Sequence, residues 1–223
     1  MKISVLQFPG TNCEYDTKYA FEQLGCEVQI IWHKEKDIPA DTDLLVIPGG
    51  FSYGDYLRSG AIARFANIME SVQEYAAKGG KVLGICNGFQ ILLEAGLLPG
   101  AMKRNDSLHF ISKYHTLKVV NTDNTFLSLL NKDDVLNIPV AHHDGNYYID
   151  ADGLKELENN NQILLKYCDK DGNLVNMNGS VSNIAGICNK EKNVFGLMPH
   201  PERAIEELLG SIDGVNMLKG FLQ

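Results

Sequence analysis

The sequence predicts an α/β fold, with an open, mostly parallel sheet, helices on both faces of that sheet, and antiparallel strands added to it. Two observations support this prediction. Between residues 3 and 100, short apolar runs alternate with segments of helical periodicity, which is typical of a parallel sheet covered by helices. After Gly100, alternating polar and apolar residues are separated by hairpin dipeptides, which are typical of antiparallel strands.

The parallel part of the sheet is expected to contain four buried strands with helices between them. The strands are predicted from apolar runs at Ile3–Phe8, Val28–Trp32, Leu44–Ile47 and Lys81–Ile85. A first helix is predicted before Gly25, from residues at helical spacing: Thr17, Ala20, Phe21 and Leu24. A second helix is predicted before Gly79, from the same spacing at Ile62, Phe65, Ala66 and Met69. Glycine is a common helix-terminating residue, so both helices have a natural end.

The second half of the chain is expected to extend the sheet with antiparallel strands. The predicted features are strands at 117–120 and 163–167, and hairpin turns at the dipeptides Asp171-Gly172 and Asn178-Gly179. A late helix is predicted over Glu202–Leu209, followed by a short tail from Gly214 to the end of the chain. No repeat, low-complexity tract or linker interrupts the sequence, so a single domain is expected over residues 1–223.

The composition is typical of a globular protein and excludes several classes of partner. Hydrophobic residues make up 44% of the 223 residues and charged residues 22%, which is enough for a sizeable core. The 20 basic and 28 acidic side chains give a net charge of −8, so nucleic acid and anionic membranes are not expected as partners. No apolar run is long enough for a signal peptide or a membrane span, and a cytoplasmic protein is expected.

The cysteines and the common cofactor motifs indicate no disulfide framework and no metal site. Five cysteines form no CxxC pair, so reduced thiols are expected at Cys13, Cys26, Cys86, Cys168 and Cys188. The sequence also lacks a P-loop, a GxGxxG motif after a strand, an HExxH motif and an EF-hand loop. No metal or nucleotide cofactor is therefore expected in this chain, and any ATP-dependent step is expected on another polypeptide.

A thiol between two glycines is the first candidate catalytic feature. The letters GICNG occupy residues 84–88, where a predicted strand gives way to a helix. This is the pattern of a nucleophile elbow with Cys86 in the place of serine. Small residues at Gly84 and Gly88 let the strand and helix backbones approach, and the helix N-terminus favours the thiolate. The alternative is that Cys86 is a small buried hydrophobe, like many cysteines.

A histidine framed by prolines is the candidate base for that thiol, within the letters MPHPER at residues 198–203. Pro201 restricts His200 to an extended backbone, in which Glu202 projects to the same side and can hold the imidazole. Alternatively, Glu202 only complements the dipole of the helix that follows. Cys13 follows the first strand at the sheet edge where ligands bind, but no base lies beside it in the sequence, so its role is open.

An oxyanion formed at this site would need backbone N–H donors. The first amide of the helix after Cys86, that of Asn87, is one candidate. A second should come from the loop after another strand, and the letters LVIPGG at residues 45–50 end a buried strand in glycines with unhindered amides. The alternative for this loop is an ordinary glycine turn.

Several of these segments together resemble a known enzyme family. The letters GICNGFQ at 84–90 and HPE at 200–202 resemble the class I, triad-type glutamine amidotransferases. Three more segments, FPGTNC at 8–13, GGFSYGDYLR at 49–58 and GLMPHPERA at 196–204, resemble the glutaminase subunits of phosphoribosylformylglycinamidine synthases of de novo purine biosynthesis. The segment AHHDG at 141–145 departs from the usual Ala-His-Gly-Glu-Gly pattern at His143 and Asp144. The resemblance implies the flavodoxin-like fold of this family.

The resemblance also implies a role for each residue of the candidate site. Cys86 would attack the side-chain amide of glutamine, and the amides of Gly50 and Asn87 would hold the oxyanion. His200, oriented by Glu202, would protonate the departing ammonia, and water would then hydrolyse the γ-glutamyl thioester with the same histidine as base.

One further site residue and the partners are implied in the same way. Gln90 matches a family position that contacts glutamine. The ammonia would pass to a large synthetase subunit that carries ATP and Mg²⁺ and converts formylglycinamide ribonucleotide to formylglycinamidine ribonucleotide. A small third subunit would help to join the two. Tyr53, Tyr56 and Arg58 are of types enriched at interfaces, so their loop is either a docking surface or an ordinary solvated loop.

Two other functions are compatible with the same residues. A stand-alone cysteine hydrolase would act on peptides or γ-glutamyl conjugates, and would need no synthetase. A non-catalytic binding subunit would keep the fold, and its Cys86 would not react with a glutamine analogue even in the assembled complex.

Overall fold

The computed structural model describes residues 1–223, and a nine-stranded sheet runs through the molecule. Its parallel strands are β1 (Lys2–Gln7), β2 (Glu27–Trp32), β3 (Leu44–Ile47), β4 (Lys81–Ile85) and β11 (Val194–Leu197). Its antiparallel strands are β10 (Ile184–Cys188), β9 (Ile163–Cys168), β6 (Ile111–Val119) and β7 (Val135–His142). The strand order β2-β1-β3-β4-β11-β10-β9-β6-β7 confirms the predicted fold class, with the antiparallel strands joined to one side of the parallel part.

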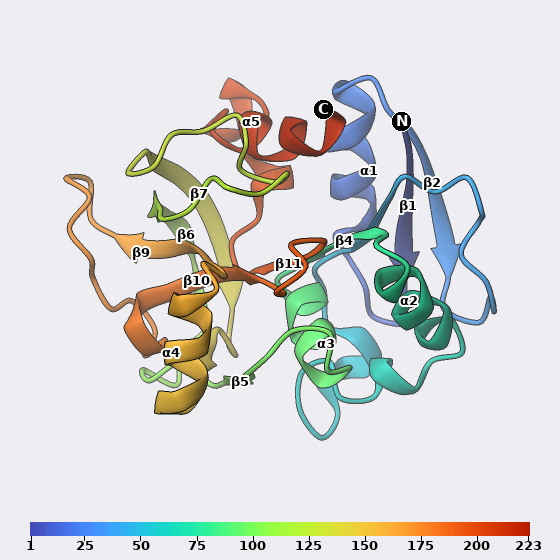
Figure 1. Cartoon of the computed structure of the whole chain (residues 1–223), viewed down its shortest axis with the longest axis horizontal. Helices are drawn as coiled ribbons and strands as arrows, with labels where there is room; N and C mark the ends of the chain where they lie inside the picture. The colour runs from blue at the N-terminus through green and yellow to red at the C-terminus, as the bar shows by residue number, and fades with distance from the viewer.

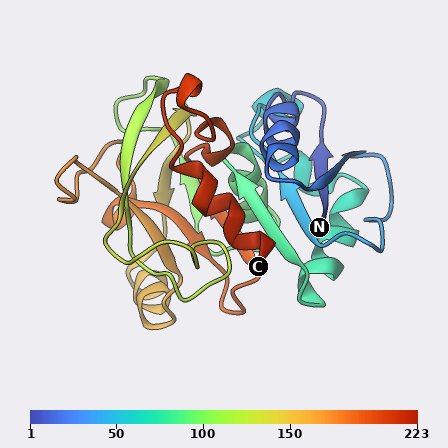
Figure 2. The same ribbon diagram turned by 90° about the horizontal axis from the view of Figure 1, so that it is seen from above.

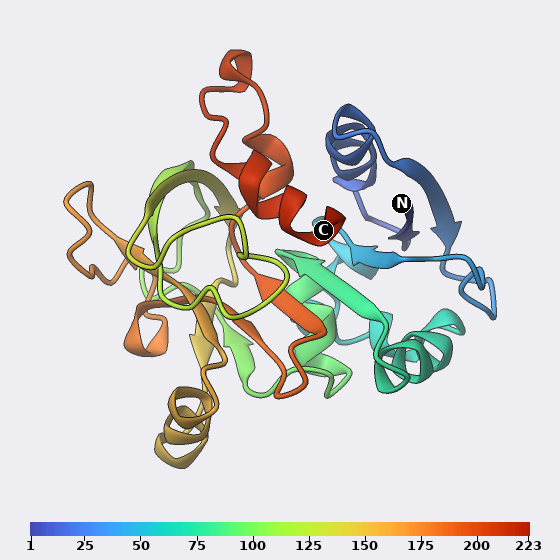
Figure 3. The same ribbon diagram turned by 45° about the horizontal axis from the view of Figure 1, so that its top comes forward.

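Helices cover both faces of the parallel part. They are α1 (Glu14–Gln23), α2 (Ile68–Ala77), α3 (Asn87–Glu94) and α5 (Gly214–Lys219), while α4 (Ala151–Asn159) lies beside the antiparallel strands (Figure 1). Helices α1 and α5 lie on one face of these strands, and α2 and α3 lie on the other (Figures 1 and 3). Seen from above, the antiparallel strands and the parallel strands form two halves with α5 between them (Figure 2). A separate antiparallel pair, β5 (Ala101–Lys103) and β8 (Asn146–Tyr148), completes the strands.

The pairing of β4 with β11 joins two segments that are far apart in the sequence. The strands are parallel, with Ile85 opposite Leu197, and the backbone N–H of Cys86 donates to the carbonyl of Leu197 at 2.7 Å. The ends of these strands therefore carry Cys86 and, three residues beyond Leu197, His200 to the same edge of the sheet.

One hydrophobic cluster of 52 buried residues forms the core and draws on both halves of the sheet. The strands β3, β10 and β11 are buried at every position, as expected for strands covered on both faces. No helix of the chain has both the length and the apolar character that crossing a bilayer requires.

The second predicted helix was placed too early. The α-helix α2 begins at Ile68, whereas Ala63–Phe65 form a short 3₁₀ turn. Ala66 has an extended backbone, with ψ at 146°, and separates the two. Phe65 is 72% exposed, so its place in the apolar pattern does not reflect a buried helix face.

The predicted late helix over Glu202–Leu209 was wrong. Two 3₁₀ turns, Pro201–Arg203 and Glu207–Leu209, are separated by non-helical backbone at Ala204 and Glu206. The buried His200–Glu202 contact and the burial of Ala204 fix the first turn in place of a helix. The true helix, α5, begins at Gly214 in the segment predicted as a tail, where a Cβ would lie 2.0 Å from a carbonyl oxygen of the first turn.

The two hairpin dipeptides had different outcomes. Gly172 has a φ of +80° and lies in a tight turn, closed by its N–H donating to Asp169 O at 3.1 Å, after β9. Asn178 does not form the tip of a hairpin. Its side chain is buried and donates to the carbonyl of Gly145 at 2.7 Å, which ties the long loop between β9 and β10 to the turn between β7 and β8.

Candidate active site

The predicted nucleophile elbow is present between β4 and α3. Cys86 has φ 51° and ψ −104°, a conformation that non-glycine residues rarely adopt. Both flanking glycines are required by the close approach of the backbones. A Cβ on Gly88 would lie 1.8 Å from the carbonyl oxygen of Ile47, and one on Gly84 would lie 2.7 Å from the carbonyl carbon of Gly88.

The Cys86 side chain is only 5% exposed, but its sulfur is not packed solely among apolar groups. It donates a weak hydrogen bond to the carbonyl oxygen of Ala141 at 3.6 Å, and the residue lines a surface cavity. The alternative of a purely structural cysteine therefore fits the strained backbone and the polar cavity less well.

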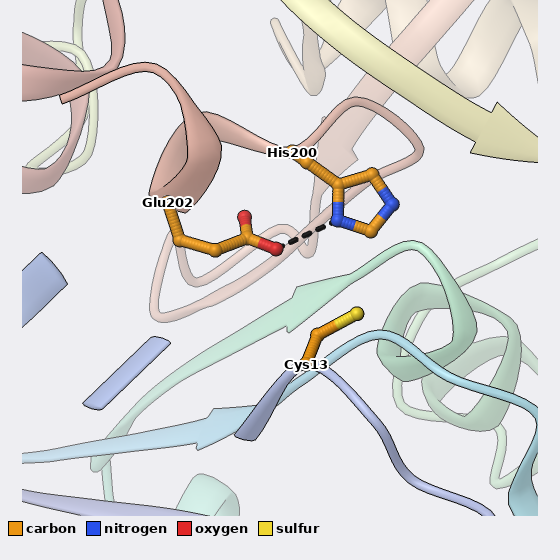
Figure 4. Close-up of side chains that lie close together, drawn as sticks. All are labelled: Cys13, His200 and Glu202. Atoms are coloured by element: carbon orange, nitrogen blue, oxygen red, sulfur yellow. Dashed lines mark hydrogen bonds and ion pairs between the residues drawn. The ribbon is translucent and has the colours of Figure 1, made fainter. Parts of the chain in front are cut away.

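His200 and Glu202 form a buried pair. The imidazole Nδ1 and the carboxylate Oε1 are 2.6 Å apart, and the two side chains are 2% and 0% exposed (Figure 4). The backbone N–H of His200 donates to the carbonyl of Pro139 in β7 at 2.8 Å, which fixes the chain just before the turn. His200 lies outside the α region as expected, with φ −109° and ψ 83°, but the predicted extended spacing is absent: Glu202 lies in the following 3₁₀ turn and reaches back to the imidazole.

Gly49 brings the thiol and the imidazole together. The point where a Cβ on Gly49 would lie is 2.8 Å from His200 Cε1, 3.0 Å from Cys13 Sγ and 3.5 Å from Cys86 Cβ. The three side chains therefore surround one residue that has no side chain of its own. Residues 13, 49, 86 and 200, which are distant in the sequence, meet at this point.

The environment of His200 favours its protonated form. Burial by itself would lower the pKa of the imidazole, but the Glu202 carboxylate and the thiols of Cys86 and Cys13 outweigh it and hold this pKa well above its usual value. Nε2 of His200 has no protein partner in its buried position, so it is free to exchange a proton with a bound substrate.

Cys13 adds a second thiol to the site. It is the N-cap residue of α1, it is 2% exposed, and its sulfur lies beside the imidazole (Figure 4). Ligand atoms of Cys13, His200 and Glu202 lie within 4.8 Å of one another, the one such group of potential metal ligands. These atoms already have partners, because Glu202 is bonded to His200 Nδ1 and Arg203 donates to the Cys13 sulfur at 3.1 Å. The absence of a metal cofactor stays a prediction.

The cavity beside Cys86 has a volume of about 300 Å³, at the lower end of the range for small-molecule sites. Polar residues outnumber apolar ones in its wall. Its charged and amide side chains are Asp55, Arg58, Gln90, Arg104, His143 and Asp144. A small polar molecule with both positive and negative groups would find complementary charges here.

Two of the three predicted substrate-contact residues line this cavity. Gly50 and Gln90 line it, and Gly50 has a φ of +149°. A Cβ on Gly50 would lie 2.7 Å from Thr11 Cα, so glycine is required there. Asn87 is the first residue of α3, and its backbone N–H therefore has no partner within the helix. Its side chain donates to Gln90 Oε1 at 2.8 Å and holds that amide in the wall.

Two acidic residues of the cavity were not identified from the sequence. The Asp144 carbonyl accepts a hydrogen bond from Gln90 Nε2 at 2.6 Å, and its carboxylate accepts one from Ser59 at 2.9 Å. Burial is the main cause that raises the pKa of Asp55 to about 6, and the nearby charge of Asp144 also raises it. Asp55 lies in the segment 49–58, which carried the family resemblance and was the available signal, whereas Asp144 is a position where the segment 141–145 departs from the family pattern.

The three predicted docking residues of the loop at 53–58 differ in their surroundings. Tyr53 points inward, and its hydroxyl is 2.7 Å from His33 Nδ1. Arg58 forms two hydrogen bonds with Glu94, at 2.6 and 2.7 Å. Tyr56 is 72% exposed and has no such partner, so of the three it is the residue available to a partner.

Comparison with known proteins gives one consistent result. The sequence matches the CobB/CobQ-like glutamine amidotransferase domain over residues 1–216. It is 69% identical to the phosphoribosylformylglycinamidine synthase subunit PurQ of Sulfurimonas denitrificans over 100% of both chains, and 63% identical to that of Wolinella succinogenes over 99% of both. The structure is similar to a chain of PurLQS from Thermotoga maritima, with a TM-score of 0.89 and 41% identity over 99% of this chain and 97% of that one.

Proposed function

This chain belongs to the CobB/CobQ-like glutamine amidotransferase family, and from that premise we propose how its site hydrolyses glutamine as a subunit of phosphoribosylformylglycinamidine synthase. One observation supports the assignment of residues above all others. Gly49 places the Cys86 elbow and the buried His200–Glu202 pair around a single point, at the edge of a polar cavity.

The reaction proceeds in two steps at Cys86. Its thiolate attacks the side-chain amide carbon of glutamine, and the backbone N–H groups of Gly50 and Asn87 hold the oxyanion. His200 protonates the amide nitrogen, the C–N bond breaks, and ammonia leaves a γ-glutamyl thioester. Water then attacks the thioester with His200 as base, which releases glutamate and restores the thiol. Glu202 keeps Nδ1 of the imidazole protonated, so that Nε2 faces the reacting atoms.

The cavity recognises the amino-acid end of glutamine by charge. The α-ammonium group lies against the carboxylates of Asp55 and Asp144, and the α-carboxylate lies against Arg104. Glutamate has a carboxylate where glutamine has the side-chain amide, so it contains no nitrogen that could leave, and it is the product and not a substrate. Gln90 lines the wall between these groups and the thiol.

The ammonia is delivered to a partner. The free base is the nucleophile, and at neutral pH most ammonia in water is protonated, so a protected route to the acceptor is favoured. A large synthetase subunit holds ATP and Mg²⁺ and converts formylglycinamide ribonucleotide to formylglycinamidine ribonucleotide, and a small subunit joins it to this chain. This chain itself needs no cofactor, and the complex works in the cytoplasm.

The large subunit docks over the mouth of the cavity. Exposed apolar side chains surround that mouth, and Phe51 and Leu57, at 44% and 87% exposure, are also part of the cavity wall. Tyr56 and Phe110 continue the exposed surface, and the rings of Phe51 and Phe110 are 6.5 Å apart. Apolar groups at this position are stabilised when a partner covers them.

The test is to replace Cys86 with Ala and assay the assembled synthase. We expect glutamine-dependent synthesis to be abolished while synthesis from an added ammonium salt continues at the wild-type rate. Cys26→Ala, at a half-buried cysteine between α1 and β2, is the matched control and should leave both activities intact. Loss of both activities in the Cys86 variant, or survival of both, contradicts the proposal. A stand-alone hydrolase is not favoured, since the relatives carry the name of a synthase subunit.

A further inference from the structure

We propose that Cys13 is a positioning residue for the His200 imidazole, and that it acts through a latch formed with Arg203 and Asp16. This inference rests on the proposed glutaminase activity. Cys13 does not line the glutamine cavity, so the reaction described above leaves its thiol unused. The latch joins the 3₁₀ turn that carries Glu202 to the first turn of α1.

The backbone of Cys13 is fixed on two sides. Its N–H donates to the carbonyl of Gly49 at 3.2 Å, and its carbonyl accepts a hydrogen bond from the Thr17 hydroxyl at 2.8 Å. From this backbone position the side chain points toward the edge of the imidazole (Figure 4). Cys13 Sγ and His200 Cε1 lie 3.0 and 2.8 Å from the point where a Cβ on Gly49 would lie, and ligand atoms of the two residues are within 4.8 Å of each other. We infer that the sulfur limits how far the ring can turn.

Arg203 connects this contact to the rest of the turn. One of its terminal nitrogens donates to Cys13 Sγ at 3.1 Å, and its guanidinium also bonds Asp16 Oδ2 at 2.9 and 2.8 Å. Arg203 directly follows Glu202 in the 3₁₀ turn. The latch therefore holds the 3₁₀ turn at 201–203, which carries the Glu202 carboxylate, in contact with the start of α1.

The properties of the Cys13 thiol fit a positioning role better than a role as nucleophile. Burial raises the pKa of Cys13, so the sulfur stays protonated, and it donates to Asn12 Oδ1 at 3.3 Å. A neutral thiol is large and soft, and it can contact an imidazole edge while it accepts a hydrogen bond from Arg203. Serine would place a smaller oxygen there, farther from the ring.

The imidazole is thus held at Nδ1 and along one ring edge, which leaves Nε2 for the reaction. Glu202 bonds Nδ1, Cys13 lies along the ring edge, and Nε2 remains without a protein partner. A ring held by Glu202 alone could swing about that hydrogen bond. Displacements of about 1 Å at a catalytic group can lower a rate about 100-fold, so the second contact matters for the rate.

The test uses Cys13→Ala and Cys13→Ser in the assembled synthase. We expect kcat for glutamine-dependent synthesis to fall about 10- to 100-fold in the alanine variant and less in the serine variant. The KM for glutamine and the ammonium-dependent rate should stay close to wild type. Asp16→Asn, which weakens the latch from the far side, should give a smaller fall in kcat, and Cys26→Ala serves as the matched control.

A second readout separates positioning from a merely structural role. Alkylation of Cys86 by iodoacetate, followed by mass spectrometry, depends on the positive charge of the neighbouring imidazolium. Because Cys13 helps to raise the pKa of His200, the pH at which this alkylation slows should move down in Cys13→Ala. An unchanged kcat, or a lowered kcat with an unchanged alkylation profile, overturns the proposal. Failure of the proposed function would instead appear in the wild-type complex, as an absence of glutamine-dependent synthesis.

Should the alanine variant not assemble, it will not co-elute with the synthetase subunit, and glutamine-dependent synthesis will be lost while the ammonium-dependent rate of the synthetase remains. The decision then rests on Cys13→Ser and Asp16→Asn, which keep a polar group at each position. If both retain wild-type kcat and the wild-type alkylation profile, the latch has no role in catalysis.

Discussion

Replacing Glu202 with Gln keeps the shape of the side chain and removes its charge. In the wild type the carboxylate is fully buried and lies 2.6 Å from His200 Nδ1. Burial lowers the pKa of this imidazole, and the Glu202 charge is the first of the groups that raise it. Without that charge the pKa of the imidazole falls, and the imidazolium that must protonate the amide nitrogen before ammonia leaves becomes less stable.

The structure sets the size of this effect. A positioned acid–base group contributes about 100- to 10,000-fold to a rate, and the amide oxygen of Gln can still accept the Nδ1 hydrogen bond. We therefore expect kcat to fall about 100- to 1,000-fold, which is about 2.7 to 4 kcal/mol of transition-state stabilisation. The KM for glutamine should change little, because Glu202 does not line the cavity. Glutaminase assays on the assembled complex measure both constants, with the exposed Glu207→Gln as control.

Stability should depend on pH in a defined direction. The pKa of His200 is higher in the folded state than its usual value of 6.5, so its protonation stabilises the fold below that pH. This contribution is lost as the pH rises through the folded-state pKa. We therefore expect Glu202→Gln to have a lower free energy of unfolding than the wild type. This difference should be larger at pH 6 than at pH 10, and chemical denaturation at the two pH values measures it. An unchanged kcat, or a raised KM at constant kcat, would refute the orienting role of Glu202.

Three further substitutions test the surroundings of the triad. Gly49→Ala places a methyl group 2.8 Å from His200 Cε1, so kcat should fall about 100-fold in a folded protein, as glutaminase assays and circular dichroism can verify. The KM of the wild type for glutamine should rise as the pH drops through about 6, where the Asp55 carboxylate becomes protonated. Asp55→Asn should have a high KM without that pH dependence, which KM measurements from pH 5 to 8 would reveal. Leu57→Glu, at an 87% exposed position, should weaken binding of the synthetase subunit in titration calorimetry and leave thermal unfolding unchanged.

The sequence predicted the central strands β1, β3 and β4 of the parallel half well, because they are short, strongly apolar runs, but it did not predict β11. The runs at 44–47 and 81–85 match β3 and β4 residue for residue, and glycine ends the first helix as expected. Strand β7 was not predicted. Its burial alternates along the chain, but it contains Pro139, which is disfavoured within strands.

The elbow and the histidine turn were also predictable, since each depends on a local pattern with a physical reason. Cys86 has its strained backbone, and His200 bonds Glu202 as expected. The roles assigned to these residues, and to Gly50, Asn87 and Gln90, remain predictions until the variants are assayed.

Features made by tertiary contacts alone could not be read from the chain. Nothing in the sequence around Cys13 indicates an imidazole 187 residues away, and the contact exists because Gly49 has no side chain. The late helix failed for a related reason. In the segment 202–209, Ala204 and Ile205 are buried beside a 3₁₀ turn whereas Leu208 is 93% exposed, so its apolar residues do not form one helical face.

The β4–β11 pairing places the catalytic residues, whereas a different segment of the chain forms much of the surface around the substrate cavity. The hydrogen bond from Cys86 N–H to the Leu197 carbonyl brings nucleophile and base together through neighbouring strands, and the segment 101–188 adds a backbone contact to the base, from His200 N–H to the Pro139 carbonyl. The same segment supplies part of the cavity wall, through Ala141 and Asp144. Evolution can thus remodel the wall, and with it the partner and the mode of control, while the hydrolytic machinery is inherited unaltered.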